Sequence, residues 1–212
     1  MTSSTVSLAS YWLQTWTRPR SAVRSLIGRG ATAAAILLAL ASGVLQSLVT
    51  GASNHVGTPY GRLVVLAIAL PIGTVWGLFQ LHLISGLLYL VARLTSTPIR
   101  FGDLRIAIGW SNVPLSAAFA VWVVATLLVG APLYVDPETM VLRTPFTGLF
   151  IALLYLATAG CFVWSTVLMV FAVAEVHRIS AWRAVGHLLV TVAALMAATG
   201  VTLAFVALLF WR

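Results

Sequence analysis

LVVLAIALPIGTVWGLFQLHLISGLLYLVA, residues 63–92, contains no charged side chain. A helix needs about 20 predominantly apolar residues to cross the roughly 30 Å hydrocarbon layer of a bilayer. A helix that is apolar on all sides lies either in the core of a large protein or in a membrane. In a chain of 212 residues, this segment therefore predicts a membrane span.

Four further segments have the same character. With 63–92 they give five predicted spans, at about 31–50, 63–92, 106–130, 148–174 and 186–210. The connections hold most of the prolines and nearly all the charge, as in STPIRFGDLR at 96–105. We therefore predict an all-α fold, a polytopic membrane protein in which residues 31–212 form one bundle of about five transmembrane helices.

The overall composition agrees with a membrane location. Hydrophobic residues make up 61% of the chain and charged residues 8%, whereas a soluble domain is about a quarter charged. The net charge of +8 comes from twelve arginines against four acids, with no lysine. No soluble basic face is left for nucleic acid, so the predicted surroundings are the lipid bilayer and other membrane proteins.

Arginine placement predicts the orientation in the membrane. With five spans, one side carries nine arginines: Arg18, Arg20, Arg24, Arg29, Arg93, Arg100, Arg105, Arg178 and Arg183. The other side carries Arg62, Arg143 and Arg212. Because cytoplasmic flanks are enriched in arginine and lysine, the amino terminus is predicted in the cytoplasm and the carboxyl terminus outside. The absence of lysine suggests a GC-rich bacterial genome, and hence a bacterial inner membrane.

Residues 1–30 are predicted to form a cytoplasmic tail that contains a short amphipathic helix. In YWLQTWTRPRSAVRSLIGR, residues 11–29, a helical wheel places tryptophan and aliphatic side chains opposite arginine and serine. Such a helix suits the membrane interface. Pro19 divides it or opens its second part. The alternative is a plain basic flank that only sets the topology.

Two prolines and three tryptophans give local expectations. The segment 63–92 is long for one span, so it is expected to tilt, to kink near Pro71, or to begin along the interface. Pro114 removes a backbone hydrogen bond inside the third span, which predicts a bend there. Trp110, Trp182 and Trp211 fall near predicted span ends, where interfacial tryptophans gather.

Polar and small residues inside the spans are candidates for helix contacts. Gln80 and His82 lie near the middle of the second segment and diverge by about 200° on a helix, so at most one points into the core. Interhelical hydrogen bonding is the first interpretation, and a proton or substrate pathway through His82 is the alternative. Gly73 and Gly77, four residues apart, predict a close approach between helices.

Catalytic chemistry is scarce in the sequence. Glu175 and His177 are two residues apart and face different sides of a helix, so they make no two-ligand metal face. Glu175 and Arg178 could pair across one turn, and a partner-binding or ion-relay acid is the alternative for Glu175. No nucleotide loop, zincin pair or hydrolase elbow occurs. We predict a non-enzymatic protein without a cofactor or metal.

The order of these features resembles the Yip domain family, named for Ypt-interacting proteins, which are five-pass membrane proteins with a cytoplasmic amino terminus. The resemblance rests on RPRSAVRSLI at 18–27, on FGDLRIAIGWSNVP at 101–114, and on Trp164 followed by AEVHRISAWRA at 174–184. It covers nearly the whole chain. It implies Gly109, Trp110 and Pro114 as a structural motif at the start of the third span.

The chain also departs from the family. The Asp-Leu-Tyr-Gly-Pro element of eukaryotic members, part of what links them to small GTPases, is absent, so GTPase binding does not carry over. The leading hypothesis is a membrane adaptor or organiser that packs with itself or with partner membrane proteins. The alternatives are a small transporter, channel or lipid-handling protein, or an accessory subunit of a larger membrane complex.

Overall fold

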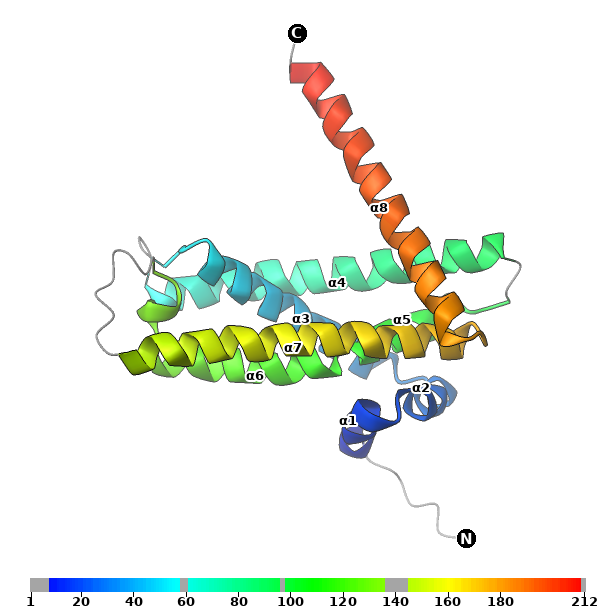
Figure 1. The fold of residues 1–212 in the computed structure, drawn as a ribbon, viewed down its shortest axis with the longest axis horizontal. Coiled ribbons are helices and arrows are strands. Elements are labelled where there is room, and N and C mark those ends of the chain that lie inside the picture. The colour runs from blue at the N-terminus through cyan, green and yellow to red at the C-terminus, as the bar shows by residue number, and fades with distance from the viewer. Residues whose placement is uncertain (1–7, 58–60, 96–97, 136–144, 211–212) are drawn as a thin grey trace.

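All regular elements of the described residues are helices. The computed structural model describes residues 8–57, 61–95, 98–135 and 145–210, and Figure 1 shows their arrangement. The elements are α1 (Leu8–Thr17), α2 (Pro19–Gly28), α3 (Thr32–Ser53), α4 (Arg62–Leu94), α5 (Phe101–Ser111), α6 (Val113–Leu128), the short 3-10 helix η1 (Ala131–Leu133), α7 (Pro145–Val176) and α8 (Ala181–Phe210).

Five membrane spans are consistent with these helices. Helices α3, α4, α7 and α8 are each long and apolar enough to cross a bilayer. Helices α5 and α6 meet this criterion together, with a bend of 45° between them. The all-α polytopic fold expected from the sequence is thus confirmed, and the bend lies at the start of α6, two residues before Pro114.

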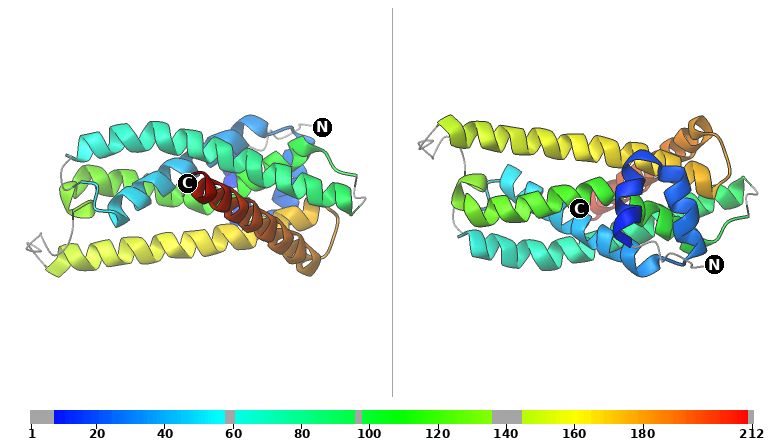
Figure 2. Two further views of the ribbon diagram at one scale, coloured as in Figure 1. Left: turned by 90° about the horizontal axis from the view of Figure 1, so that it is seen from above. Right: turned by 90° about the horizontal axis from the view of Figure 1, so that it is seen from below.

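The spans alternate in direction along the bundle. Figures 1 and 2 show α3, α4, the α5–α6 pair and α7 side by side, with neighbouring spans in sequence running in opposite directions. Helix α4 ends, α5 begins, α7 ends and α8 begins at the same end of the bundle. The short connections from α3 to α4 and from α4 to α5 favour this arrangement, because helices joined by a few residues pack readily as antiparallel neighbours.

Helix α4 is longer than the bilayer is thick. It runs from Arg62 through Pro71 to Leu94 as one helix of 33 residues, about 50 Å at 1.5 Å per residue. Pro71 is exposed on its surface and does not divide the helix. A helix of this length must tilt or extend beyond the hydrocarbon layer.

The amino-terminal region forms two short helices. Helices α1 and α2 lie across the bundle axis (Figure 2), and Pro19 opens α2 at its first position. Val23 and Leu26 are buried, and α2 packs against α5 and α7. Arg18 and Ser25 are exposed. The predicted apolar stripe therefore faces the bundle, while its location at the membrane interface stays a prediction.

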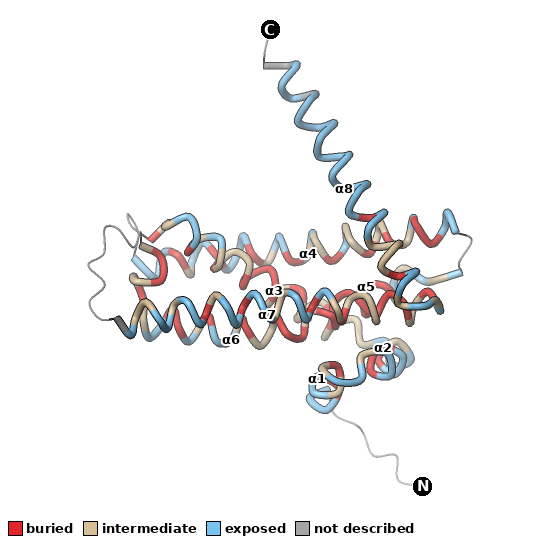
Figure 3. The backbone as a smooth tube through the Cα atoms, viewed as in Figure 1, coloured by how far each residue is buried: buried red, intermediate tan, exposed pale blue. Residues whose placement is uncertain are grey.

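Helix α8 leaves the bundle. Figure 1 shows it rising away from the other spans, and Figure 3 shows most of its length exposed. Only its first turns pack, against α4 and α7, and Thr191 is its last buried residue in the described part. The side-by-side packing of the bundle thus extends to four spans, and the fifth, α8, presents its apolar surface outward.

Trp110 differs from the interfacial position expected for it. Its side chain is only 2% exposed and lies in a cluster with Tyr11, Leu26 and Ile106. The reason is that α1 and α2 cover the end of α5, so the start of the third span is enclosed by protein. Trp182 is 85% exposed as expected, and Trp211 lies outside the described residues.

Candidate functional site

Helices α3 and α4 share a polar cluster near the middle of the bundle. The Gln46 side-chain amide donates to Gln80 Oε1 at 2.9 Å, and the Gln80 amide donates back to Gln46 Oε1 at 3.0 Å. The Trp76 indole N–H also donates to Gln46 Oε1, at 3.1 Å. Reciprocal amide bonds satisfy polar groups that would otherwise face hydrocarbon without a partner.

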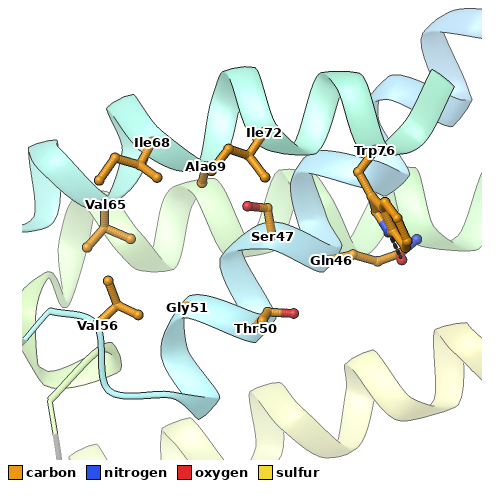
Figure 4. Close-up of a pocket in the computed structure, with 10 residues that line it drawn as sticks. All are labelled: Gln46, Ser47, Thr50, Gly51, Val56, Val65, Ile68, Ala69, Ile72 and Trp76. Atoms are coloured by element: carbon orange, nitrogen blue, oxygen red, sulfur yellow. Dashed lines mark hydrogen bonds between the residues drawn. The ribbon is translucent and has the colours of Figure 1, made fainter. Parts of the chain in front are cut away.

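An apolar cavity of about 550 Å³ lies beside this cluster (Figure 4). Its walls are formed by α3, α4 and the residue Val56 after α3. Gln46 and Trp76 stand at one end of it, and Thr50 offers a hydroxyl from α3. Val65, Ala69 and the other lining residues of α4 are apolar. Because no charged side chain lines the cavity, it suits an apolar occupant such as an acyl chain.

His82 lies on a different face of α4 from Gln80. Its side chain is exposed, and its Nδ1 lies 2.8 Å from the Leu78 carbonyl oxygen on the preceding turn. Its ring also packs near Phe101 of α5, at a centroid distance of 6.4 Å. Of the two predicted polar residues, only Gln80 forms a hydrogen bond with another helix, and His82 contacts α5 through its ring alone.

Gly73 and Gly77 lie at the closest contact of α3 and α4. A Cβ placed at Gly73 would lie 2.7 Å from the Gly43 carbonyl oxygen, and one at Gly77 would overlap the carbonyl oxygen of Ala39. A Cβ at Gly43 would in turn overlap the carbonyl of Gly73. Backbone thus meets backbone here, which only glycine allows.

Gly109, Trp110 and Pro114 surround the break between α5 and α6. A Cβ at Gly109 would lie 2.6 Å from the Ala35 carbonyl oxygen of α3, so this residue permits a second close helix contact. Trp110 and Pro114 are buried. Pro114, which has no N–H to donate, is accepted in the first turn of α6 because a helix leaves its first N–H groups unpaired.

Side chains cover the carbonyl groups that the break leaves free. Ser111 and Asn112 both donate to the Ile108 carbonyl, at 2.7 and 3.1 Å. Ser165 of α7 donates to the Ser111 carbonyl at 2.8 Å. A broken helix at membrane depth needs such partners, because lipid provides none. Side-chain hydrogen bonds therefore stabilise the break between α5 and α6.

The carboxylate of Glu175 pairs with α2. Arg24 Nε donates to Glu175 Oε1 at 2.6 Å, with the two side chains 75% and 14% exposed. This ion pair raises the pKa of Arg24, through the hydrogen bond first and the charge second. The sequence suggested Arg178 as the partner. Arg178 instead takes a left-handed backbone conformation with φ of 53° after the end of α7, which turns it out of helical register.

The ion pair borders a charged cavity of about 530 Å³ between α2, the start of α5 and the end of α7. Arg20, Arg24 and Arg178 line it together with Asp103 and Glu175. Three guanidinium groups against two carboxylates leave an excess of one positive charge. Because the Arg24 side chain is exposed to solvent, the pair adds little to stability, and its main effect is to fix the position of α2 on α7.

A histidine pair, which was not predicted from the sequence, lies at the turn between α7 and α8. His177, 2% exposed, and His187 place their Nδ1 atoms 3.0 Å apart. Their presence on either side of the α7–α8 turn was visible, but only the turn geometry shows that they meet. Burial, then the charge of His187, lowers the pKa of His177 to about 4. At neutral pH His177 is therefore neutral.

The lowered pKa of His177 predicts that the folded state loses stability in acid. An unfolded histidine has a pKa of about 6.5, so between pH 6.5 and about 4 the unfolded chain binds a proton that the folded chain does not. The stability of the wild type should fall as the pH drops through this window. Thermal unfolding in detergent micelles from pH 7 to 4 should show a shallower decline for His177→Gln, and parallel declines would contradict the prediction.

Metal-ligating side chains are not clustered in the described residues. Among residues 8–57, 61–95, 98–135 and 145–210, no group of three or more histidine, cysteine, aspartate or glutamate side chains could hold a metal ion. Cys161 is a free thiol, half-buried on α7. What the arrangement does provide is close helix packing and two cavities at different depths.

Comparison with known proteins identifies the family. No curated protein and no solved structure is significantly similar to the chain. The model of the Yip1 domain matches residues 13–203, which takes in every helix from α2 to α7, half of α1 and most of α8. That match spans most of the 212 residues. Together with the multiple apolar helices, it establishes that the chain is an integral membrane protein belonging to the Yip1 domain family.

Proposed function

We infer that the protein is a non-enzymatic membrane adaptor or organiser that acts by helix packing, and that α8 is the helix that packs against a second copy of the chain. The observation that supports this most directly is the exposure of α8. All side chains described from Val192 to Leu208 are exposed, although the other long spans each bury a face. Lipid also covers exposed apolar helices, so the exposure of α8 does not by itself indicate a protein partner.

A row of small residues on α8 favours a protein partner over lipid alone. Ala193, Ala197, Gly200, Ala204 and Ala207 alternate at spacings of four and three, which places them on one face. Small residues on a helix surface let a second helix backbone approach closely, and packing replaces the absent hydrophobic force between helices in lipid. The same face on a second copy gives a two-fold symmetric contact.

Substitution on this face should weaken self-association. Ala197→Leu places a bulky side chain in the small-residue face, and we expect it to reduce the dimer fraction of protein purified in mild detergent by roughly tenfold. Ala198→Leu makes the same change about 100° away around the helix and should leave the fraction within about twofold. Light scattering of the purified proteins measures the mass of the complex.

Two results would count against the proposal. One is a wild type that is strictly monomeric and copurifies with no recurrent membrane partner. The other is an equal effect of Ala197→Leu and Ala198→Leu, which would indicate a general disturbance of α8. A wild type that copurifies with another membrane protein in place of a second copy would retain the adaptor role and refute self-association.

We also propose that the amino terminus lies in the cytoplasm and the carboxyl terminus outside, in a bacterial inner membrane. The nine arginines on one side of the spans support this. Reporter fusions after Arg29, Pro137 and Arg212 should report inside, outside and outside. A cytoplasmic signal after Arg212 would mean that the α5–α6 pair or α8 does not cross the membrane.

A further inference from the structure

A third cavity lies where the corner between α1 and α2 meets α7. It has a volume of about 720 Å³. Arg18 and Arg20 line it from the corner, Trp16 from the end of α1, and Trp164, Leu168 and Phe171 from α7. It thus combines two cations with an apolar wall, and it shares Arg20 with the charged cavity around Glu175.

Neither arginine of this cavity forms an ion pair with a carboxylate of the described residues. Neither Asp103 nor Glu175, the two carboxylates in the described residues, lines it. Glu175 is paired with Arg24 in the neighbouring cavity. The Arg20 guanidinium stacks over the Phe171 ring, 5.7 Å from the centroid, which holds one cation at the apolar wall. A ligand for this place must therefore carry negative charge next to an apolar part.

The depth of the cavity matches the boundary of the bilayer. If the middle of α7 lies at the middle of the bilayer, about ten residues on either side fill the hydrocarbon layer. Phe171 then lies close to the level where hydrocarbon gives way to headgroups, with Leu168 and Trp164 deeper. Arg20 packs over Phe171 at this level, and Arg18 lies two residues before it, at the junction of α1 and α2.

We propose that this cavity binds one acidic phospholipid of the leaflet that faces α1 and α2. The lipid phosphate lies between Arg18 and Arg20, and an acyl chain runs along Trp164 and Leu168. Guanidinium groups bind phosphate well, because their N–H groups match its oxygens. A net negative headgroup is favoured over a zwitterionic one, since an attached cation would repel the two arginines.

Lipid binding to the purified full-length protein tests the proposal. Native mass spectrometry with phosphatidylglycerol or phosphatidylcholine should show tighter binding of phosphatidylglycerol. The double variant Arg18→Gln, Arg20→Gln should weaken that binding by roughly thirtyfold, because each cation at the membrane surface contributes about fivefold. Arg183→Gln, an exposed arginine at the start of α8, is the control for general charge and should change binding less than threefold.

A second variant and a competitor distinguish a lipid site from a site for a soluble anion. Phe171→Leu leaves the charge intact but removes the ring beneath Arg20, and should weaken phosphatidylglycerol binding by roughly threefold. Glycerol phosphate, which has the anion without the acyl chains, should not displace the lipid. Displacement by glycerol phosphate would indicate a soluble-anion site instead. Equal binding of both lipids, or an equal loss in Arg183→Gln and the double variant, would overturn the proposal.

Discussion

Gly73→Ala is expected to lower the free energy of unfolding by about 3 kcal/mol, at the upper end of the usual range for overpacked cores. The new methyl group would meet the backbone of α3, with the Gly43 carbonyl oxygen 2.7 Å away. A side chain could rotate aside, but a backbone cannot. Helices α3 and α4 must therefore separate, which also stretches the reciprocal bonds between Gln46 and Gln80, two turns along α4.

Gly86→Ala is the matched control on the same helix. A Cβ at Gly86 would meet nothing within 4 Å, so alanine there should be neutral or stabilise α4 by up to about 1 kcal/mol. Unfolding of both variants and the wild type can be followed by circular dichroism in mixed micelles with increasing dodecyl sulfate. Equal stabilities for Gly73→Ala and Gly86→Ala would show that the α3–α4 contact is looser than described.

The sequence located one side of this contact but not the other. The four-residue spacing of Gly73 and Gly77 indicated that some helix approaches α4 closely. It could not indicate which helix, because a row of small residues carries no information on its partner. Ala39 and Gly43 of α3 have the same spacing, and the structure shows that these two rows face one another.

Features that follow from local rules, such as the length and the proline content of a segment, were predictable from the sequence. The five apolar segments follow from the length needed to cross hydrocarbon. The bend next to Pro114 follows from its missing N–H. These are local rules, and they hold whatever the helices pack against.

Features that depend on tertiary contact were not predictable. The carboxylate of Glu175 has Arg178 one turn away in sequence, yet the end of α7 turns Arg178 away and α2 brings Arg24 to it. His177 and His187 meet only because of the same turn. The burial of Trp110 likewise required the covering helices α1 and α2.

The largest functional effect is expected on α8. If two copies pack along the small-residue face, cysteines on that face come within disulfide distance of their counterparts, whereas cysteines opposite do not. Cys161 is the only native cysteine, so Cys161→Ala gives a background without interfering thiols. The test positions are Ala197 and Ala204, with Thr202 about 180° away as the control.

Oxidative cross-linking of these single-cysteine variants in native membranes is the most direct test of α8 as a packing helix. The account predicts dimers cross-linked at Ala197→Cys and Ala204→Cys and little at Thr202→Cys. Cross-linking that is equal at all three positions, or absent at all three, would contradict it.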